Sequence, residues 1–422
     1  MRSMRLQISN INAIKEADIR LDGITVLTGE NGTGKSTVCR TLFATIKALR
    51  KDLDDVRWSR RRSVWALLMD YRMRSDTVSM GAYDQSLETL MDALADLNPK
   101  QADEKSIRSI LDRSLPPDGN EDVEERMLLI DRLCKRLSYS SEEVLRQLRG
   151  DVMRGEHVFD HDAQGPNGYM EAEFTERRPI RLTVQGDVII LSQPESAFVN
   201  TSVDVTMLDD PRLLDDTGVF PSFAGRRRRP KDTHASDLTE KILDHDETDA
   251  VTALANNDSI ASVLNALRDH AGGDLIVDRY GLKFQEDGLN RVLDMQDVSD
   301  GRKTFIMLLR LLSDNQLNED DVLILDEPEI HLHPAWQLDL AKMLVELRHA
   351  FHLTILVSTH SPYFLEALET YTNQRKITDE AHYYMMRRQD GACVCEDVTH
   401  QLERAYGVLA EPFNRLDNEE GE

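Results

Sequence analysis

The sequence predicts an α/β fold with a mostly parallel sheet and a mainly helical insertion. An apolar strand at residues 24–27 leads into a Gly-rich stretch, and apolar residues then recur at helical spacing from Val38 to Leu49. Residues 50–160 are dominated by helical patterns, whereas the last third of the chain alternates between helix and strand. This alternation is typical of a parallel core, and the helical stretch before it indicates an insertion.

The strand-rich start of the chain is followed by amphipathic helices. Residues 4–28 form two short alternating segments and then the apolar strand, and helices are predicted near residues 85–99 and 121–137. The apolar faces of these two helices are Leu87, Leu90, Met91, Leu94 and Leu97, and Val123, Met127, Ile130, Cys134 and Leu137.

Strand character returns near residue 178, with a hairpin turn at Gly186-Asp187. Residues 209–237 are polar, charged and rich in Pro and Gly, which predicts a mobile loop. Two short strands flank Tyr280-Gly281, and the helices and strands of the last third follow.

The composition is that of a globular protein. The chain has 422 residues, of which 40% are hydrophobic and 30% charged, enough for one large domain with insertions or roughly two to three ordinary domains. No apolar run approaches the ~20 residues of a membrane span, and the opening stretch MRSMRLQISN lacks the apolar core of a secretory signal. The four cysteines are too few and too scattered for a disulfide framework (Cys39, Cys134, Cys393 and Cys395). We therefore expect a cytoplasmic protein without membrane contact.

The chain is strongly acidic. Its 51 Lys and Arg residues and 76 Asp and Glu residues give a formal net charge of −25. Nonspecific nucleic-acid binding depends on Lys and Arg neutralising phosphates, so this balance argues against it. One local candidate for nucleic acid or an acidic partner is the run Arg226, Arg227, Arg228 and Arg229, for which a solvated loop is the alternative interpretation.

The stretch GENGTGKST at residues 29–37 fits the pattern G-x-x-x-x-G-K-[ST] at every fixed position. It follows an apolar strand and opens a helix, the context in which this pattern is a phosphate-binding loop, or P-loop. Glycines let the backbone N–H groups curl around phosphate oxygens, and the helix N-terminus adds positive potential. Lys35 would reach the β- and γ-phosphates of ATP, and the Ser36 hydroxyl would coordinate Mg²⁺. The predicted nucleotide-binding residues of the loop are Asn31, Gly32, Thr33, Gly34, Lys35, Ser36 and Thr37.

A second motif is the apolar strand VLIL at residues 322–325, which ends in Asp326 and Glu327. Ligands bind at the carboxyl ends of the strands in open parallel sheets. Asp326 suits the Mg²⁺ shell, whereas Glu327 points differently and can orient and deprotonate an attacking water. Two acids after a strand can also be a plain helix cap, but their pairing with a P-loop favours catalysis.

A third motif is the apolar strand LTILVST, which ends at Thr359 and His360. A lone histidine is usually structural, but the tip of a core strand is where a γ-phosphate sensor is expected. We therefore assign His360 a catalytic role beside Lys35 and Glu327. His331 and His333 have the H-x-H spacing of a metal site, yet no further ligands accompany them.

Together these residues resemble the ABC-type ATPase heads shared by SMC, RecF-like and OLD-family proteins. The resemblance rests on ITVLTGENGTGKST, LILDEPEIHLHPAWQ and TILVSTHSPYFLEAL, and covers roughly residues 1–48 and 180–400 with gaps. Within this group, the chain is most similar to AAA family ATPases with an OLD-like head, as found in bacterial phage-defence systems. This resemblance implies a P-loop NTPase fold of ABC-ATPase type, with ATP and Mg²⁺ at the interface of a homodimer or higher homo-oligomer.

The resemblance also implies a division of the chain. Residues 1–48 would be the first part of the head, with the P-loop, and residues 49–170 the helical insertion. Head strands (171–208), the mobile loop (209–237) and the rest of the head (238–422) would follow. The residues after Ser361 are too few for the TOPRIM nuclease domain of OLD nucleases.

In this family a Ser-x-Gly signature contacts the nucleotide of the opposite subunit. The candidate here is VSDGRK, with Ser299 and Gly301, which departs from the family pattern LSGGQ. Gly301 permits close backbone approach, and Arg302 and Lys303 are expected to leave the rim electropositive. Alternatively, Ser299 only caps the following helix. For the glutamine that completes the family's site, the best candidate is Gln193.

The resemblance implies a nucleotide-driven dimeric sensor or scaffold, in anti-phage defence with a separate effector protein such as a nuclease or toxin. A RecF-like DNA-repair ATPase is one alternative, against which the net charge of −25 stands. Another alternative is an assembly protein that traps ATP with little turnover. The altered signature favours that alternative, and the intact Glu327 disfavours it.

Overall fold

The computed structural model describes residues 4–49, 60–61, 64–71, 85–97, 102–115, 123–138, 167–174, 180–185, 188–191, 203–216, 233–243, 258–278, 281–289, 291–313 and 316–420. The chain divides into two compact units. We call the first unit the head; it comprises Met1–Lys47, Gln147–Ser196 and Ser202–Glu422. The second unit, the insertion, comprises Ala48–Arg146 and Ala197–Thr201.

A large sheet organises the head. Within the described residues it has eleven strands in the order β6-β5-β4-β1-β2-β14-β13-β3-β12-β11-β7. Their bounds are β1 Met4–Ile11, β2 Ile14–Leu21, β3 Ile24–Gly29, β4 Asn167–Phe174, β5 Ile180–Gln185, β6 Val188–Leu191, β7 Val205–Leu208, β11 Val322–Asp326, β12 Thr354–Thr359, β13 Ala381–Gln389 and β14 Ala392–Asp397. Strands β13, β3, β12, β11 and β7 are parallel neighbours, whereas β6, β5, β4, β1 and β2 pair antiparallel. The predicted α/β fold with a parallel core is confirmed.

The parallel part of the sheet brings the three sequence motifs to one edge. Strand β12 lies between β3, which ends at the P-loop, and β11, which ends at Asp326. In register, Thr359 pairs with Thr28 of β3, and Ser358 pairs with Asp326. All three strands are buried along their whole length, which explains why they read as continuous apolar runs.

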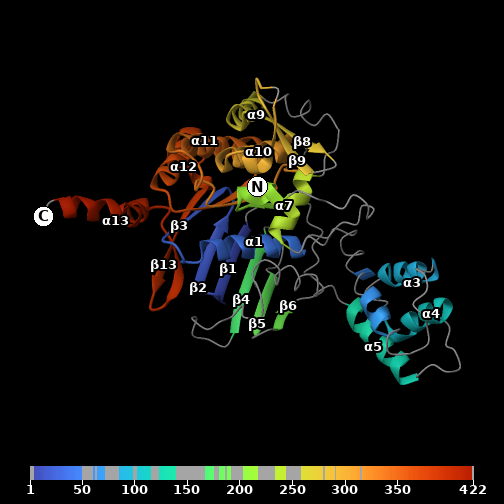
Figure 1. The fold of residues 1–422 in the computed structure, drawn as a ribbon. Helices are drawn as coiled ribbons and strands as arrows, with labels where there is room; N and C mark the ends of the chain where they lie inside the picture. The colour runs from blue at the N-terminus through green and yellow to red at the C-terminus, as the bar shows by residue number, and fades with distance from the viewer. Residues whose placement is uncertain are drawn as a thin grey trace. The chain divides into compact units, whose positions relative to one another are not determined.

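Helices cover this parallel core. Their bounds are α1 Lys35–Leu49, α7 His234–Leu243, α9 Asp258–Ala271, α10 Asp300–Ser313, α11 Pro334–Phe351, α12 Pro362–Arg375 and α13 Leu402–Glu420. Helices α9 to α12 lie close together over the sheet (Figure 1) and share one apolar core with it. In that core, Val26 and Val357 of the strands are buried together with Phe305 of α10, Leu344 of α11 and Phe364 of α12. The motif-bearing edges of β3, β11 and β12 are therefore fixed by a well-packed layer.

A small antiparallel sheet precedes α10. It consists of β8 Gly273–Asp278, β9 Gly281–Glu286 and β10 Val292–Asp294, followed by the 3-10 helix η3 Met295–Asp297. This matches the two strands predicted around Tyr280-Gly281. Phe284 and Met295 anchor this part of the head in the main core.

The insertion is helical where it is described. Its helices are α3 Gln85–Ala95, α4 Glu104–Ser114 and α5 Val123–Ser138, with shorter helical stretches at 60–61 and 64–71. They share a separate core that includes Leu90, Leu94, Leu111 and Leu133. The predicted apolar face of α5 is wrong at its start, because Val123 and Met127 are 70% and 53% exposed while Leu129 and Leu133 are buried.

The boundary between head and insertion differs from the predicted one. Strand β4 begins at Asn167 and pairs with β1, so the head sheet resumes inside the predicted insertion 49–170. The strand is of mixed polarity, and its pairing with β1, more than 150 residues earlier in the sequence, marks it as part of the head.

The prediction of a mobile loop at residues 209–237 is wrong at both ends of the segment. Pro211–Asp216 forms the 3-10 helix η2, whose Leu214 is buried in the head core, and α7 begins at His234. Residues 217–232 lie outside the described residues. The polar side chains that suggested a loop have distant partners instead: Asp215 Oδ1 lies 2.7 Å from Lys303 Nζ.

The remaining element of the head is the 3-10 helix η4 Thr378–Glu380. Among the helices in the described ranges, none combines the length and the apolarity that a bilayer crossing requires.

Candidate active site

The P-loop connects β3 to α1, and its glycines hold backbone conformations that other residues adopt only with strain. Gly29, Gly32 and Gly34 have φ values of 137°, 74° and 94°. A Cβ atom on Gly29 would lie 2.1 Å from the carbonyl oxygen of Met386, and one on Gly34 would lie 2.9 Å from the Cγ1 atom of Ile14. Glycine is therefore required at positions 29 and 34 for both conformation and space, and at position 32 for conformation alone.

Lys35 is buried at the mouth of this loop. Its Nζ donates hydrogen bonds to the carbonyl oxygens of Gly29 and Glu30, at 2.9 and 3.0 Å, and it lies 3.6 Å from Glu327 Oε1. Asn31 and Gly32 are exposed at the tip, and Thr33 is buried, with its hydroxyl donating to Glu30 O at 2.8 Å. The loop is thus tied to itself by side chains while its tip faces solvent.

Asp326 and Ser36 meet across the site. The Asp326 carboxylate is hydrogen-bonded to the hydroxyls of Ser36 and Ser358. Burial raises the pKa of Asp326 above its ordinary value, and these hydroxyl contacts oppose the shift. A carboxylate and a hydroxyl next to each other are the hard oxygen donors that Mg²⁺ prefers, so the residues present fit the expected ion. Thr37, the last predicted loop residue, is half-buried in the first turn of α1.

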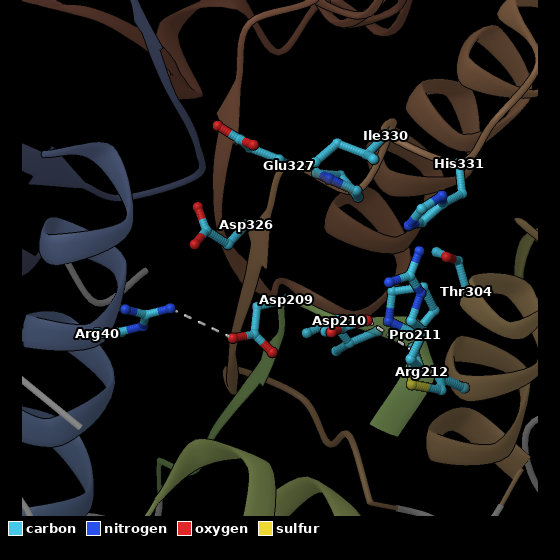
Figure 2. A pocket seen from close by; sticks show the side chains of 13 residues that line it. Arg40, Asp209, Asp210, Pro211, Arg212, Thr304, Asp326, Glu327, Ile330 and His331 are labelled. Atoms are coloured by element: carbon cyan, nitrogen blue, oxygen red, sulfur yellow. Dashed lines mark hydrogen bonds and ion pairs between the residues drawn. The ribbon is translucent and has the colours of Figure 1, made fainter. Parts of the chain in front are cut away.

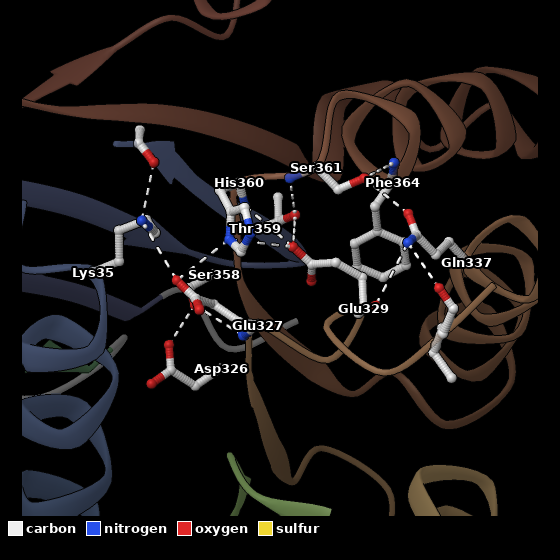
Figure 3. Close-up of polar contacts among 12 residues, drawn as sticks. Lys35, Asp326, Glu327, Glu329, Gln337, Ser358, Thr359, His360, Ser361 and Phe364 are labelled. Carbon is white, nitrogen blue, oxygen red and sulfur yellow. Dashed lines mark hydrogen bonds and ion pairs between the residues drawn. The ribbon is translucent and has the colours of Figure 1, made fainter. Parts of the chain in front are cut away.

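Glu327 lies at the end of β11 in the left-handed region, with φ of 53°. Such a conformation costs a non-glycine residue of order 1–3 kcal/mol and occurs preferentially at functional sites. It is held by the Glu327 N–H, which lies 3.0 Å from Ser358 O and 3.1 Å from Ser358 Oγ. The turn directs the carboxylate away from Asp326 and toward the P-loop (Figure 3).

His360 follows β12, and its imidazole is 41% exposed. Its Nδ1 lies 3.5 Å from Glu327 Oε1, the same oxygen that lies 3.6 Å from Lys35 Nζ (Figure 3). The structure therefore brings the three predicted catalytic residues together. It does so because β3, β12 and β11 are neighbours whose carboxyl ends share one edge of the sheet.

A cavity of about 350 Å³ lies beside Asp326 and Glu327 (Figure 2). Sequence reasoning missed several residues that line it, among them Arg40 of α1, Asp209 after β7 and Arg212 of η2. Arg40 NH2 is 3.8 Å from Asp209 Oδ2, and His234 Nε2 is 2.6 Å from the same oxygen. A signal was present in the sequence, since VTML followed by Asp209-Asp210 repeats the pattern of an apolar strand ending in two acids. Because β7 is the parallel neighbour of β11, its end reaches the same edge.

The signature segment begins α10. Ser299 is exposed immediately before the helix, and its carbonyl accepts from the Lys303 N–H at 3.2 Å. Gly301 is buried against the segment after β11, where its absent Cβ leaves room for His331 O. The prediction that Arg302 and Lys303 leave an electropositive rim is wrong. Lys303 is buried between Asp215 and Asp300, and Arg302 NH1 lies 3.0 Å from Glu286 Oε1, so both cations are already neutralised.

Gly301 can be tested directly. We expect Gly301→Ala to destabilise the head by about 1–3 kcal/mol, because the added Cβ would lie 2.8 Å from His331 O and 3.4 Å from Leu332 Cδ2. Thermal unfolding of the purified variant measures the effect. Gly407→Ala in α13 is the matched control, since a Cβ there meets nothing within 4 Å. Equal Tm values for the two variants would contradict this account of Gly301.

The other predicted residues are placed as follows. His333 Nδ1 accepts from the Ala335 N–H at 3.2 Å and so caps α11, while His331 Nε2 lies 3.9 Å from Asp300 Oδ2. Gln193 and the run Arg226–Arg229 fall outside the described residues, so their proposed roles stay predictions.

Parts of this chain are similar in sequence to known proteins. Residues 195–366 match the family model described as "AAA domain, putative AbiEii toxin, Type IV TA system", and residues 5–57 match one described as "AAA domain". The chain is 28% identical over 148 residues to "Retron Ec83 probable ATPase" of Escherichia coli. That match covers 32% of this chain and 25% of the relative, so the chain spans about a quarter of the relative's length.

Solved structures with similar chains include two SMC heads. One is the "SmcHead bound to the C-winged helix domain of ScpA", with a TM-score of 0.44, 11% identity and coverage of 95% of this chain and 98% of that one. Another is the SMC head domain from Thermotoga maritima, with a TM-score of 0.39, 12% identity and coverage of 94% and 99%. The match at residues 5–57 contains the P-loop, and the match at residues 195–366 contains Asp326 and Glu327. The head therefore has the fold of a P-loop NTPase, and two parts of it match models of AAA domains.

Proposed function

We propose that the chain binds ATP with Mg²⁺ and hydrolyses it to ADP and phosphate. One observation carries the proposal: residues from all three motifs lie next to one another. Glu327 Oε1 lies within 3.6 Å of both Lys35 Nζ and His360 Nδ1. A carboxylate held in this way, in a strained turn beside a phosphate-binding loop, is suited to act as a general base.

Each residue has a proposed part in the reaction. The P-loop N–H groups and Lys35 hold the phosphates, Glu327 orients the attacking water and takes its proton, and His360 senses the γ-phosphate. Ser36 and Asp326 would hold Mg²⁺, which supplies charge neutralisation on the phosphate oxygens. Little covalent chemistry is required of the protein, so positioning and charge dominate.

We further propose that two or more copies bind ATP between their heads, as a nucleotide-driven sensor or scaffold in anti-phage defence that acts through a separate effector. The exposed Ser299 at the N-terminus of α10 supports the shared site, because a helix N-terminus favours an anion. The matched relative is named "Retron Ec83 probable ATPase", and the family description reads "putative AbiEii toxin, Type IV TA system". The retron name supports the defence part of the proposal, whereas the separate effector rests on the resemblance to phage-defence ATPases alone.

Lys35→Ala tests the nucleotide-binding part. We expect it to weaken ATP binding by about tenfold to a hundredfold, because a charge-assisted contact to phosphate contributes roughly 1.5–3 kcal/mol. Binding of a fluorescent ATP analogue to the purified protein measures the loss. Lys376→Ala, at the end of α12 and exposed, is the control that should bind like the wild type. If Lys35→Ala also binds with wild-type affinity, the P-loop is not the nucleotide site.

A second candidate function, trapping of ATP with little turnover, is favoured by one observation. The two cations of the signature segment are paired with acids of the same chain, Lys303 with Asp215 and Arg302 with Glu286, so neither is free to meet a γ-phosphate. A single-turnover assay separates the candidates. Slow hydrolysis of bound ATP, with a stable ATP complex, would favour trapping.

A further inference from the structure

A buried carboxyl group lies behind the proposed catalytic residues. Glu329 follows Asp326 and Glu327 in the segment that leads to α11, and its side chain is only 3% exposed. Burying a carboxyl group is unfavourable unless it is protonated or well paired. Burial accordingly raises the pKa of Glu329 above its ordinary value. A residue whose only task was to fill this space would avoid that cost by being apolar.

The partners of Glu329 are the residues that place the imidazole of His360. Glu329 Oε1 accepts from the Thr359 hydroxyl and, at 3.1 Å, from the backbone N–H of His360. The same oxygen lies 3.9 Å from His360 Nδ1, which lies 3.5 Å from Glu327 Oε1 on its other side (Figure 3). Glu329 thus holds the backbone of His360 and flanks its ring, while Glu327 flanks the ring from the P-loop side.

The segment that carries Glu329 is itself fixed. Gln337 Nε2 donates to Leu332 O at 3.1 Å, and Gln337 Oε1 accepts from the Ser361 hydroxyl at 2.8 Å. Ser361 in turn caps α12 by accepting from the Phe364 N–H at 3.3 Å. The connection from β11 to α11 is therefore joined to the end of β12 at two places, so that Glu329 and His360 keep a fixed separation.

One oxygen of Glu329 makes all of these contacts. In the part of the chain that the structure describes, Oε2 is buried without a hydrogen-bond partner. The contacts that matter for His360 thus need one acceptor oxygen and not a full carboxylate. Glutamine keeps such an oxygen, whereas leucine, of similar size, has none.

We propose that Glu329 is a positioning residue for the proposed ATP hydrolysis, acting through His360 by fixing its backbone and ring relative to Glu327. The proposal rests on the proposed function for its effect on rate, but the geometry it describes exists without catalysis. Loss of the acceptor leaves two donors without their acceptor, the His360 N–H and the O–H of Thr359, so the imidazole loses its fixed position. Misplacement of a catalytic group by as little as about 1 Å can reduce a rate by roughly 10²-fold.

The rate test is a double-mutant cycle. We expect Glu329→Leu to lower kcat by about tenfold or more, with ATP affinity retained within about twofold, and Glu329→Gln to recover most of the rate. In a His360→Ala background, Glu329→Leu should cause no further loss, because its route of action is already gone. An undiminished loss in that background would show that Glu329 acts on the fold in general and would overturn the proposal.

A second measurement does not depend on hydrolysis. In protein labelled with ¹³C-histidine, the signal of His360, assigned by its absence in His360→Ala, should move in Glu329→Leu and stay near its wild-type position in Glu329→Gln. Should Glu329→Leu not fold, Thr359→Val removes one donor to the same oxygen and should move the signal in its place. If the wild type does not hydrolyse ATP, the proposed function fails. The histidine signal then decides by itself whether Glu329 positions His360. An unmoved signal in Glu329→Leu, or in Thr359→Val where that variant stands in, overturns the proposal.

Discussion

Glu327→Gln is expected to bind ATP with wild-type affinity and to lose hydrolysis by about 10²–10⁴-fold, the contribution of a positioned general base. The amide keeps the size and the hydrogen-bonding shape of the side chain but cannot accept a proton from water. The backbone contacts that hold the turn, from the Glu327 N–H to Ser358, do not involve the side chain and remain. Steady-state release of phosphate and binding of a fluorescent ATP analogue measure the two properties separately.

The same substitution at the other end of the strand provides the control. Glu319 is exposed just before β11, and Glu319→Gln should hydrolyse ATP like the wild type. Because Glu327→Gln binds ATP without consuming it, the variant should also accumulate as an ATP-bound oligomer, which size-exclusion chromatography with and without ATP detects. A Glu327→Gln protein that turns over ATP at the wild-type rate would remove Glu327 from the mechanism.

The catalytic side of the site could be predicted because its signals are local. The P-loop depends on glycines at fixed spacing, and its helix starts at Lys35 as expected. Asp326 and His360 stand at the ends of apolar strands, and such strands are recognisable without knowing their neighbours. Only the order of the strands in the sheet turns these separate signals into one site.

The rest of the site depends on contacts between distant parts of the chain. Lys303 looked like part of an electropositive rim, but Asp215, far away in the sequence, lies 2.7 Å from its Nζ and neutralises it. The residues of η2 were predicted as a loop for the same reason, because the composition of a segment does not reveal the distant partners of its polar side chains. Asp209 was missed for a different reason: the strand before it, β7, is short, and its place beside β11 is a property of the whole sheet.

The signature segment remains the part of the site where two interpretations compete, and variants mixed in trans should separate them. Ser299 is exposed at the start of α10, so an arginine there points into solvent and leaves the packing of Gly301 and Lys303 inside the head intact. A bulky cation at this position would nonetheless block a nucleotide that arrives from another copy. Lys35→Ala and Ser299→Arg are each expected to lose at least about 90% of the ATPase activity, since each spoils both sites of a symmetric dimer.

Mixing the two variants should restore part of that activity. In a mixed dimer, one site combines Lys35→Ala with Ser299→Arg and is inactive, while the other combines the intact Lys35 of one copy with the intact Ser299 of the other. Random exchange makes half of the dimers mixed, with half of their sites intact, so about a quarter of the wild-type activity should return. The mixture is incubated until subunits exchange, followed by phosphate release, and each variant alone at the same total concentration is the control. Thermal unfolding verifies that Ser299→Arg is folded. If Ser299→Arg alone keeps full activity while folded and dimeric, Ser299 is only the start of a helix, and the opposite copy contacts the nucleotide through other residues.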